Sequence, residues 1–312
     1  MNRESTPAFR LDRILELTRR AALAPSPKIL AGFRNPALAV EWKSDGSPVT
    51  ALDREAEQQI REILKSDPDH IWPVLGEEFG GDTTGSQYRW VVDPIDGTMP
   101  FSRGLPYFGT LVAFEETAPS PSAVTHTAAN PAGDTAHLNA NRASDDGRRN
   151  PTTASDNNRP TTNRALTGAI QLPAFAELYT AARGTGAHCN GSPISVAPRR
   201  DLADCMVSAP EIQKFRVAGL EEGYERLGGV VRYFRGNGDC WMHAMAARGA
   251  VDAVVEFSLN RWDIAATEVI VEEAGGLFFT RPSRTVPRKY DTVFGSAHAA
   301  EEIVKLLDFK PE

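Results

Sequence analysis

The run from Trp90 to Thr110, WVVDPIDGTMPFSRGLPYFGT, constrains this chain more than any other segment. It holds two aspartates three residues apart, Asp93 and Asp96, directly before a turn through Gly97 and Thr98. Carboxylates are hard oxygen ligands that suit Mg²⁺, and the amides of Gly97 and Thr98 can point at an anion if a helix begins there. An ordinary Asp/Pro/Gly turn is the competing interpretation. The segment therefore indicates a metal and phosphate site only if other parts of the chain supply partners.

The composition is that of an ordinary globular chain with a negative charge balance. The 312 residues are 41% hydrophobic and 24% charged, and the formal net charge of -7 argues against a nucleic-acid-binding protein, which needs a basic face. No apolar run approaches about 18 residues and the first five residues do not open a signal segment, so we expect a cytoplasmic protein without membrane contacts. The cysteines Cys189, Cys205 and Cys240 are widely spaced and odd in number, which predicts reduced thiols.

Periodicity and capping signals predict a chain of alternating helices and strands. One helix spans Phe9 to Ala24 and ends before Pro25, and another begins after Thr50, where Asp53 completes a sequence typical of a capping box. Strands are predicted at Tyr88–Asp93, Tyr107–Glu115, Thr167–Leu172, Glu177–Arg183 and Val251–Phe257. Two more helices are predicted at Asp239–Arg248 and Trp262–Ala274. Pro94 is expected to break the first of these strands.

The segment from Ala118 to Arg164 differs in composition from the rest of the chain. It is rich in Ala, Thr, Asn, Ser, Pro and Arg and has almost no large apolar residue, so it cannot bury enough surface to offset its ordering entropy. We predict a disordered insertion there. A partner-docking arm is the alternative, although nothing in the segment repeats or carries strong net charge.

Three blocks, in a fixed order, make the chain similar to a known family. They are GEEFG from Gly76 to Gly80, DPIDGT from Asp93 to Thr98, and WDIAATEVIVEEAGG from Trp262 to Gly276. Supporting matches are KSDGSPVTALDREAE from Lys43 to Glu57 and RGTGAHCNGSPISV from Arg183 to Val196. In these blocks the chain resembles the inositol monophosphatase family of Mg²⁺-dependent, lithium-sensitive sugar and nucleotide phosphatases. The resemblance spans nearly all of the chain except the insertion.

The resemblance implies a mixed fold of helices and sheets, α/β or α+β by class. It would be a five-layered α/β/α/β/α sandwich of the inositol monophosphatase and fructose bisphosphatase type. An N-terminal half over residues 1–196 would hold the metal-binding motifs, and a C-terminal half over residues 197–312 would close the site with Asp263. The insertion would lengthen a hairpin connection, which a fold tolerates because loop closure costs only about 0.6 kcal/mol more per doubling of length. A homodimer is expected on the same ground.

The resemblance also implies a site for two or three Mg²⁺ ions. Glu77 and Asp93 would hold the ion that activates water, together with the carbonyl of Ile95. Asp93 would bridge to a second ion, which Asp96 and Asp263 would also bind. Six oxygen donors from distant segments are hard to explain by helix capping alone, which favours the metal site.

The resemblance assigns the handling of the attacking water to three side chains. Thr98 would orient the water with Glu77, and Asp53 would fix Thr98 through a hydrogen bond. Each acid also has a plainer interpretation. Glu77 could be a solvated acid beside Glu78, itself expected to lie behind the ligands, and Asp53 and Asp263 could be helix-capping residues.

The expected pocket for the leaving alcohol holds two acids. Glu256 precedes Asp263 by the interval at which the family places a glutamate that binds a substrate hydroxyl. Asp239 lies in a GDCW run that resembles the histidinol-phosphate phosphatase branch, toward which the GLPYFGT run also leans. An ammonium about 4 Å from a carboxylate gains about 4 kcal/mol before desolvation at an effective dielectric near 20, so this pocket suits a cationic substrate such as L-histidinol phosphate. The expected substrate contacts are Asp96, Gly97, Thr98, Asp239, Glu256 and Asp263, with Lys43 either near the phosphate or on the surface.

Several alternatives remain open for the alcohol pocket. Asp239 could cap a helix, Glu256 could be an edge-strand acid, and Cys240 and His243 are expected to be core residues rather than transition-metal ligands. The Met99–Pro100 pair departs from both branches of the family. We predict a phosphoric monoester hydrolase that acts on L-histidinol phosphate in histidine biosynthesis. The runner-up is an inositol-1-monophosphatase, followed by a nucleotide or fructose bisphosphatase relative and, distantly, a non-catalytic phosphoester-binding scaffold.

Overall fold

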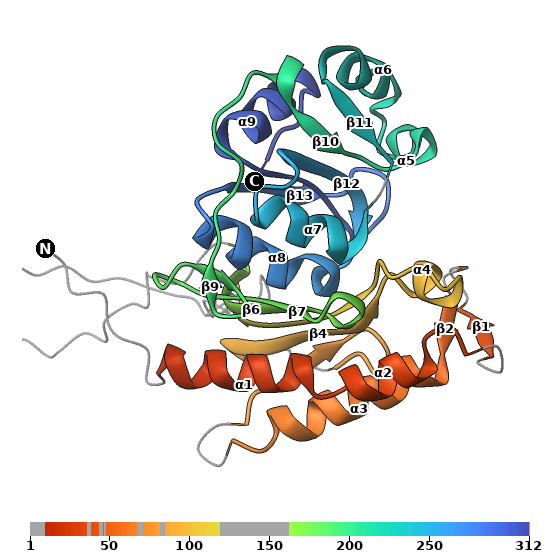
Figure 1. The fold of residues 1–312 in the computed structure, drawn as a ribbon, viewed down its shortest axis with the longest axis vertical. Helices are drawn as coiled ribbons and strands as arrows, with labels where there is room; N and C mark the ends of the chain where they lie inside the picture. The colour runs from red at the N-terminus through yellow and green to blue at the C-terminus, as the bar shows by residue number, and fades with distance from the viewer. Residues whose placement is uncertain are drawn as a thin grey trace, which may run out of the picture.

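The computed structural model describes residues 10–35, 39–43, 46, 48–67, 71–81, 85–118, 162–236 and 238–311. Within these ranges the elements stack as helices, sheet, helices, sheet and helices, as Figure 1 shows. The predicted α/β/α/β/α sandwich is therefore confirmed. None of the helices in the described ranges is long and apolar enough to cross a membrane.

The N-terminal residues form the first two layers. Helices α1 (Leu11–Leu23), α2 (Ser26–Gly32) and α3 (Ala51–Leu64) lie below a large sheet in Figure 1. The sheet has the order β3-β4-β5-β6-β7-β8-β9, with β3 (Val74–Gly76), β4 (Tyr88–Asp96), β5 (Gly109–Glu116), β6 (Arg164–Leu172), β7 (Glu177–Ala182), β8 (Ala187–Cys189) and β9 (Ser192–Pro193). Trp90 and Phe114 pack with α1 and α3, whereas Val91 and Leu111 face the next layer. Both faces of the sheet are covered, which explains its nearly continuous apolar runs.

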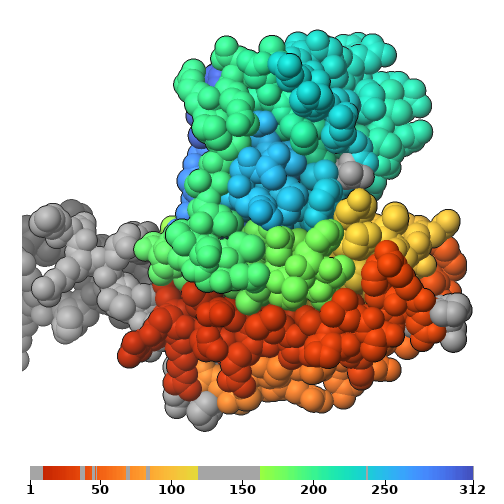
Figure 2. Space-filling model, viewed as in Figure 1, coloured from red at the N-terminus to blue at the C-terminus, as the bar shows by residue number. Residues whose placement is uncertain are grey.

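The C-terminal residues form the other three layers. Helices α7 (Asp239–Ala247) and α8 (Arg261–Glu273) lie between the sheets, and the second sheet has the order β11-β10-β12-β14-β13. Its strands are β10 (Met206–Ser208), β11 (Tyr233–Arg235), β12 (Ala253–Leu259), β13 (Leu277–Pro282) and β14 (Tyr290–Gly295), and its outer face packs against α5 (Ile212–Val217), α6 (Glu221–Val230) and α9 (Ala297–Leu306). Figure 2 shows the N-terminal elements as the base of one face and the C-terminal elements above them.

The N-terminal helices form as predicted, with one addition. Thr50 caps α3, and its backbone N–H donates to the Asp53 carboxylate, so the predicted capping box is confirmed. The first helix ends before Pro25, as expected, but the helix α2 that follows was not predicted. Pro27 is compatible with α2 because it stands in the first turn, where its missing N–H would have no helical partner.

Strand β4 differs from its prediction. It continues through Pro94 to Asp96, and its register against β5 shifts between Asp93 and Asp96. Pro94 lacks an N–H, but its carbonyl accepts a hydrogen bond of 2.8 Å from Thr110 Oγ1, which holds it to β5. The expected break at Pro94 is therefore wrong. An irregularity that re-aims side chains takes its place, as is common beside active sites.

Strands β5 and β6 are antiparallel neighbours, which confirms that the insertion lies in a hairpin connection. Arg164 pairs with Glu116, and the Ala118 N–H donates to Asn163 Oδ1 at 2.9 Å. The predicted insertion, Ala118 to Arg164, therefore included ordered residues at both of its ends. Its remainder, residues 119–161, lies outside the described residues. The division into halves at residue 196 stays a prediction.

Candidate active site

A cavity of about 780 Å³ opens where β4, β12, α7 and α8 meet. Six carboxylates and three lysines line it: Glu77, Asp93, Asp96, Asp239, Glu256 and Asp263, with Lys43, Lys214 and Lys289. Ile95, Gly97 and Thr98 also line it, so each predicted site residue except Asp53 reaches the cavity. Residues from distant parts of the sequence thus meet in one place.

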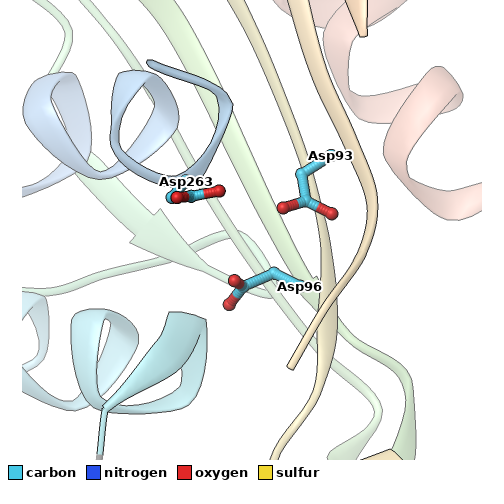
Figure 3. Close-up of side chains that lie close together, drawn as sticks. All are labelled: Asp93, Asp96 and Asp263. Atoms are coloured by element: carbon cyan, nitrogen blue, oxygen red, sulfur yellow. The ribbon is translucent and has the colours of Figure 1, made fainter. Parts of the chain in front are cut away.

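Three aspartates form the acidic centre of this cavity. Asp93, Asp96 and Asp263 each offer an oxygen within 4.8 Å of the others, and Figure 3 shows the three side chains converging from β4 and α8. Burial, together with the charges of Glu77, Asp96 and Asp263, raises the pKa of Asp93 well above its usual value. Burial and the charges of Asp239 and Asp263 do the same to the pKa of Asp96. Three carboxyls this close, one of them buried and two half-buried, cannot all ionise readily unless a cation joins them.

A divalent metal fits this centre. Asp93 Oδ1 is buried and has no hydrogen-bond partner among the described residues. An orphaned carboxylate oxygen is costly unless a donor or a cation occupies its lone pairs. The donors are oxygens alone, with no histidine or cysteine among the three, and this set suits Mg²⁺ rather than a transition metal.

Asp263 both caps α8 and faces the cavity. It stands at the third position of the helix, where its Oδ2 accepts a hydrogen bond of 2.6 Å from the N–H of the N-cap Asn260. Burial raises the pKa of Asp263 to about 7, although the bond from Asn260 acts against this rise. The helix-cap interpretation is confirmed, and it is compatible with the metal-ligand prediction, because Asp263 accepts the cap hydrogen bond and also offers an oxygen to the acidic centre.

Lys43 connects the GEEFG turn to the cavity. Its ammonium donates to Glu77 Oε1 at 2.8 Å and to Glu78 Oε1 at 2.6 Å. Burial alone would lower the pKa of Lys43, but the bonds to the two glutamates outweigh it and raise the pKa. The alternative of a plain surface lysine is wrong, because the Lys43 side chain is only 24% exposed. Glu78 lies behind Glu77, as expected, and burial raises its pKa.

Thr98 and Asp53 lie together at the end of β4. The Thr98 hydroxyl is within hydrogen-bond distance of the Ile95 carbonyl (2.9 Å) and Asp53 Oδ1 (3.3 Å). Asp53 is fixed in turn by Thr50, whose N–H and hydroxyl both donate to Oδ2. Burial raises the pKa of Asp53. The predicted contact between Asp53 and Thr98 is present, and Asp53 also completes the helix cap.

The end of the cavity where the alcohol pocket was predicted is built around Glu256. Its Oε1 accepts the Asp239 N–H at 3.1 Å, and its Oε2 lies 3.0 Å from His243 Nε2. The edge-strand interpretation of Glu256 is wrong, because β12 is the central strand of its sheet and Glu256 is buried. Asp239 opens α7 at φ 60° and follows the N-cap Gly238, which has no side chain that could cap the helix.

At this end of the cavity, neighbouring charges shift the pKa values of Asp239 and His243. Burial and the charge of Glu256 raise the pKa of Asp239 to about 6, while His243 and Lys214 act to lower it. Burial would lower the pKa of His243, but Glu256 outweighs burial and raises it. His243 is buried, as expected of a core residue, yet it also lines the cavity.

Sequence reasoning missed three residues with ionisable side chains that line the cavity, namely His243, Lys214 and Lys289. His243 could have been found, because it stands four residues after Asp239 and so shares a face of the predicted helix with it. Lys214 and Lys289 also line the cavity, but neither stands in a motif of its own. They reach the site through the folding of the C-terminal sheet, which no local pattern reports.

The chain is similar to several known proteins. A family model described as the inositol monophosphatase family matches residues 10–137 and 161–312. A histidinol-phosphatase from Chlorobaculum parvum is 31% identical over 248 residues, covering 79% of this chain and 78% of that protein. A fructose-1,6-bisphosphatase/inositol-1-monophosphatase from Aquifex aeolicus is 28% identical over 273 residues, covering 86% of each. The solved structure of extragenic suppressor protein suhB from Bartonella henselae has a TM-score of 0.71 at 23% identity, over 95% of this chain and 99% of that one, which supports the fold.

Proposed function

The chain belongs to the inositol monophosphatase family and is a phosphomonoesterase, and we propose that it hydrolyses L-histidinol phosphate to L-histidinol and phosphate with Mg²⁺ as its metal. The main support is that Asp93, Asp96 and Asp263 meet within 4.8 Å in a cavity that Asp239 also lines. The similar histidinol-phosphatase from Chlorobaculum parvum supports the same proposal. A cytoplasmic homodimer in histidine biosynthesis is part of the same proposal.

The proposed metal site uses ligands from the turn after β3, from β4 and from α8. Glu77, Asp93 and the Ile95 carbonyl would hold one Mg²⁺, and Asp93, Asp96 and Asp263 would hold another, with room for a third ion left open. When bound, the ions supply Lewis acidity toward the phosphoryl oxygens and lower the pKa of water. Asp93 is the shared ligand in this scheme, which agrees with its orphaned, buried oxygen.

The chain's own residues would orient the water and the ester. Thr98, whose hydroxyl contacts Asp53 and the Ile95 carbonyl, orients the attacking water, and Glu77 takes its proton. The water oxygen attacks phosphorus in line while the bond from phosphorus to the ester oxygen breaks, and the leaving oxygen takes up a proton as the alcohol departs, so no phosphoenzyme forms. The amides of Gly97 and Thr98, at the start of the short helix α4 (Thr98–Ser102), receive the phosphate.

Asp239 is the proposed partner of the substrate's ammonium. Its carboxylate lines the cavity and makes no hydrogen bond to another described residue that would compete for it. Both oxygens of Glu256 already accept or share hydrogen bonds, so Glu256 fixes the backbone of Asp239. Each oxygen has a second lone pair, and Glu256 also remains the proposed acceptor for a substrate hydroxyl.

The second candidate is hydrolysis of inositol 1-phosphate. Lys214 lies close enough to Asp239 to lower its pKa, and it would offset part of the negative charge that a cationic substrate needs. A neutral polyol would tolerate this lysine better than an ammonium would. The Aquifex aeolicus relative, which is named for inositol-1-monophosphatase activity, supports the same alternative.

A panel of phosphate esters tests the function. Phosphate release is measured with L-histidinol phosphate, inositol 1-phosphate, fructose 1,6-bisphosphate and adenosine 3′,5′-bisphosphate, each with Mg²⁺ and with EDTA. We expect the highest kcat/KM for L-histidinol phosphate, and Asp93→Asn should lower kcat by at least about 100-fold, since even outer residues of a metal site cost 10- to 100-fold. Faster hydrolysis of inositol 1-phosphate would replace the substrate, and an unchanged rate for Asp93→Asn would remove Asp93 from the mechanism.

A further inference from the structure

Ser258 stands in a strained bulge at the end of β12. Its φ is 62°, in the left-handed region that side chains other than glycine rarely adopt. Glu256 pairs with Thr292 and Leu259 pairs with Tyr290, so Asp291 alone lies opposite the two residues between them. Two residues opposite one define a β-bulge, and such strain persists only where the surroundings hold it.

Asp291 is the group that holds the bulge. Its side chain is fully buried, and Oδ1 accepts the Ser258 N–H at 3.2 Å. Oδ2 faces Arg281 on the neighbouring strand β13, with Nη2 at 3.2 Å and Nε at 3.3 Å. The Arg281 guanidinium is buried too, and it lies 4.3 Å from the centroid of the Phe309 ring. The carboxylate is therefore fixed on one side by a charge and presents its other oxygen to the strained amide.

The bulge leads directly into the metal-binding end of α8. Ser258, Leu259 and Asn260 line the cavity in succession. Asn260 is the N-cap of α8, and its N–H binds Oδ2 of Asp263. If Ser258 relaxed to a negative φ, the following residues would turn away, and Asn260 would no longer present Asp263 toward Asp93 and Asp96.

We propose that Asp291 is a positioning residue: by holding Ser258 in its left-handed conformation it keeps Asp263 at the distance from Asp93 that a shared metal requires. The inference rests on the proposed function, because it takes Asp263 as a metal ligand. Asp291 itself does not line the cavity. Its effect passes through the backbone of the bulge and through Asn260.

A pair of variants separates positioning from stability. Asp291→Ala should weaken the binding of Mg²⁺ alone, measured by isothermal titration calorimetry, by about 10-fold. Adding Ser258→Gly should restore most of this affinity, because glycine accepts a positive φ without an anchor. The melting temperature should stay low in both variants, since both leave Arg281 buried without its anion. A purely structural role would move affinity and melting temperature together.

Asp252 provides a matched control. It is a buried aspartate at the other end of β12 that pairs with Arg200 at 2.9 Å and accepts a backbone N–H from Met206 at 2.8 Å. Asp252→Ala should lower the melting temperature yet bind Mg²⁺ within about twofold of the unmodified chain. Equal losses of affinity in Asp252→Ala and Asp291→Ala, or no recovery with Ser258→Gly, would overturn the proposal.

Two further measurements keep the outcome decisive. If Asp291→Ala does not fold, Asp291→Asn replaces it, since its amide oxygen can still accept the Ser258 N–H; near-normal Mg²⁺ affinity supports the proposal and a loss of about 10-fold or more overturns it. Failure of the proposed function is recognised separately, as the absence of phosphate release by the unmodified chain. Mg²⁺ binding that does not change in Asp263→Asn would show that the metal role of Asp263 is at fault, and with it the inference.

Discussion

At the scale of single residues, several acids serve the fold and the site at once. Asp53 and Asp263 each complete a capping box and also stand in or behind the cavity. The sequence could predict both uses, because capping follows a short local pattern and the site follows the family motifs. It could not predict Asp291, whose contacts with Ser258 and Arg281 join separate strands. Such a role depends on register, which no local pattern reports.

Asp239 is expected to select for a cationic substrate. Asp239→Ala should lower kcat/KM for L-histidinol phosphate by about 10- to 100-fold, as expected for loss of a hydrogen bond to a charged group, and should change inositol 1-phosphate much less. Parallel kinetics on both esters provide the measurement, with the exposed Asp201→Ala as a control. Equal losses on the two substrates would contradict the role of Asp239 in selecting a cation.

At the scale of elements, α3 shows how one helix positions two parts of the site. Asp53 reaches Thr98, and Glu57, one turn later on the same face, accepts the N–H groups of Glu78 and Phe79. The helix was predicted from periodicity and its cap from the spacing of Thr50 and Asp53, and the strands β4, β5, β6, β7 and β12 were predicted as well, whereas the other strands of the described residues were not. The continuation of β4 through Pro94 was not, because the tertiary contact of its carbonyl with β5 overrides the local preference of proline.

Substitution of Glu57 tests whether α3 holds the turn that carries Glu77. Its carboxylate is fully buried and also binds Arg61, so Glu57→Ala leaves several donors without a partner. We expect a loss of about 1–3 kcal/mol in the free energy of unfolding and a fall in kcat of about 10-fold, because the turn that carries Glu77 loosens. Chemical denaturation and steady-state kinetics measure the two effects. Glu62→Ala, an exposed position on the same helix, should show neither, and a normal kcat in Glu57→Ala would contradict the argument.

At the scale of the whole molecule, the acidic centre lies where the large sheet meets the helices that separate the two sheets. Asp93 and Asp96 come from β4, and Asp263 comes from α8. Periodicity alone could predict the elements but not this meeting, since the contacts span more than 160 residues of sequence. The family motifs supplied that information. The motifs did not predict that Lys214 lines the cavity or that His243 contacts Glu256 there.

The buried carboxyls make stability depend on pH and on the metal. In the metal-free protein the pKa of Asp263 is raised from 3.8 to about 7. Between these two pH values the folded protein therefore keeps a proton on Asp263 that the unfolded chain has released. This contribution is present in full below the unfolded pKa and is lost as the pH rises through the folded pKa. The melting temperature with EDTA should therefore fall between about pH 5 and pH 7.5. Saturating Mg²⁺ should raise it by about 5 °C or more at pH 7.5, and by less at pH 5.

Differential scanning calorimetry at the two pH values measures this coupling. Asp263→Asn removes one of the titrating groups and one proposed ligand, so both the fall with pH and the gain from Mg²⁺ should shrink. Asp201→Asn, at an exposed position, should behave like the unmodified chain. A Mg²⁺ effect of the same size at both pH values would contradict the linkage.

Helix α8 is enclosed by the two sheets, and nine of its thirteen residues are buried. Its first turn carries Asp263, and the remaining turns fill the space between the layers. A helix without an open face has almost no position at which mutations can accumulate neutrally. Over evolutionary time this part of the chain should therefore drift more slowly than the solvent-facing α6, and a search for new substrate preferences by random mutagenesis would find its viable variants elsewhere.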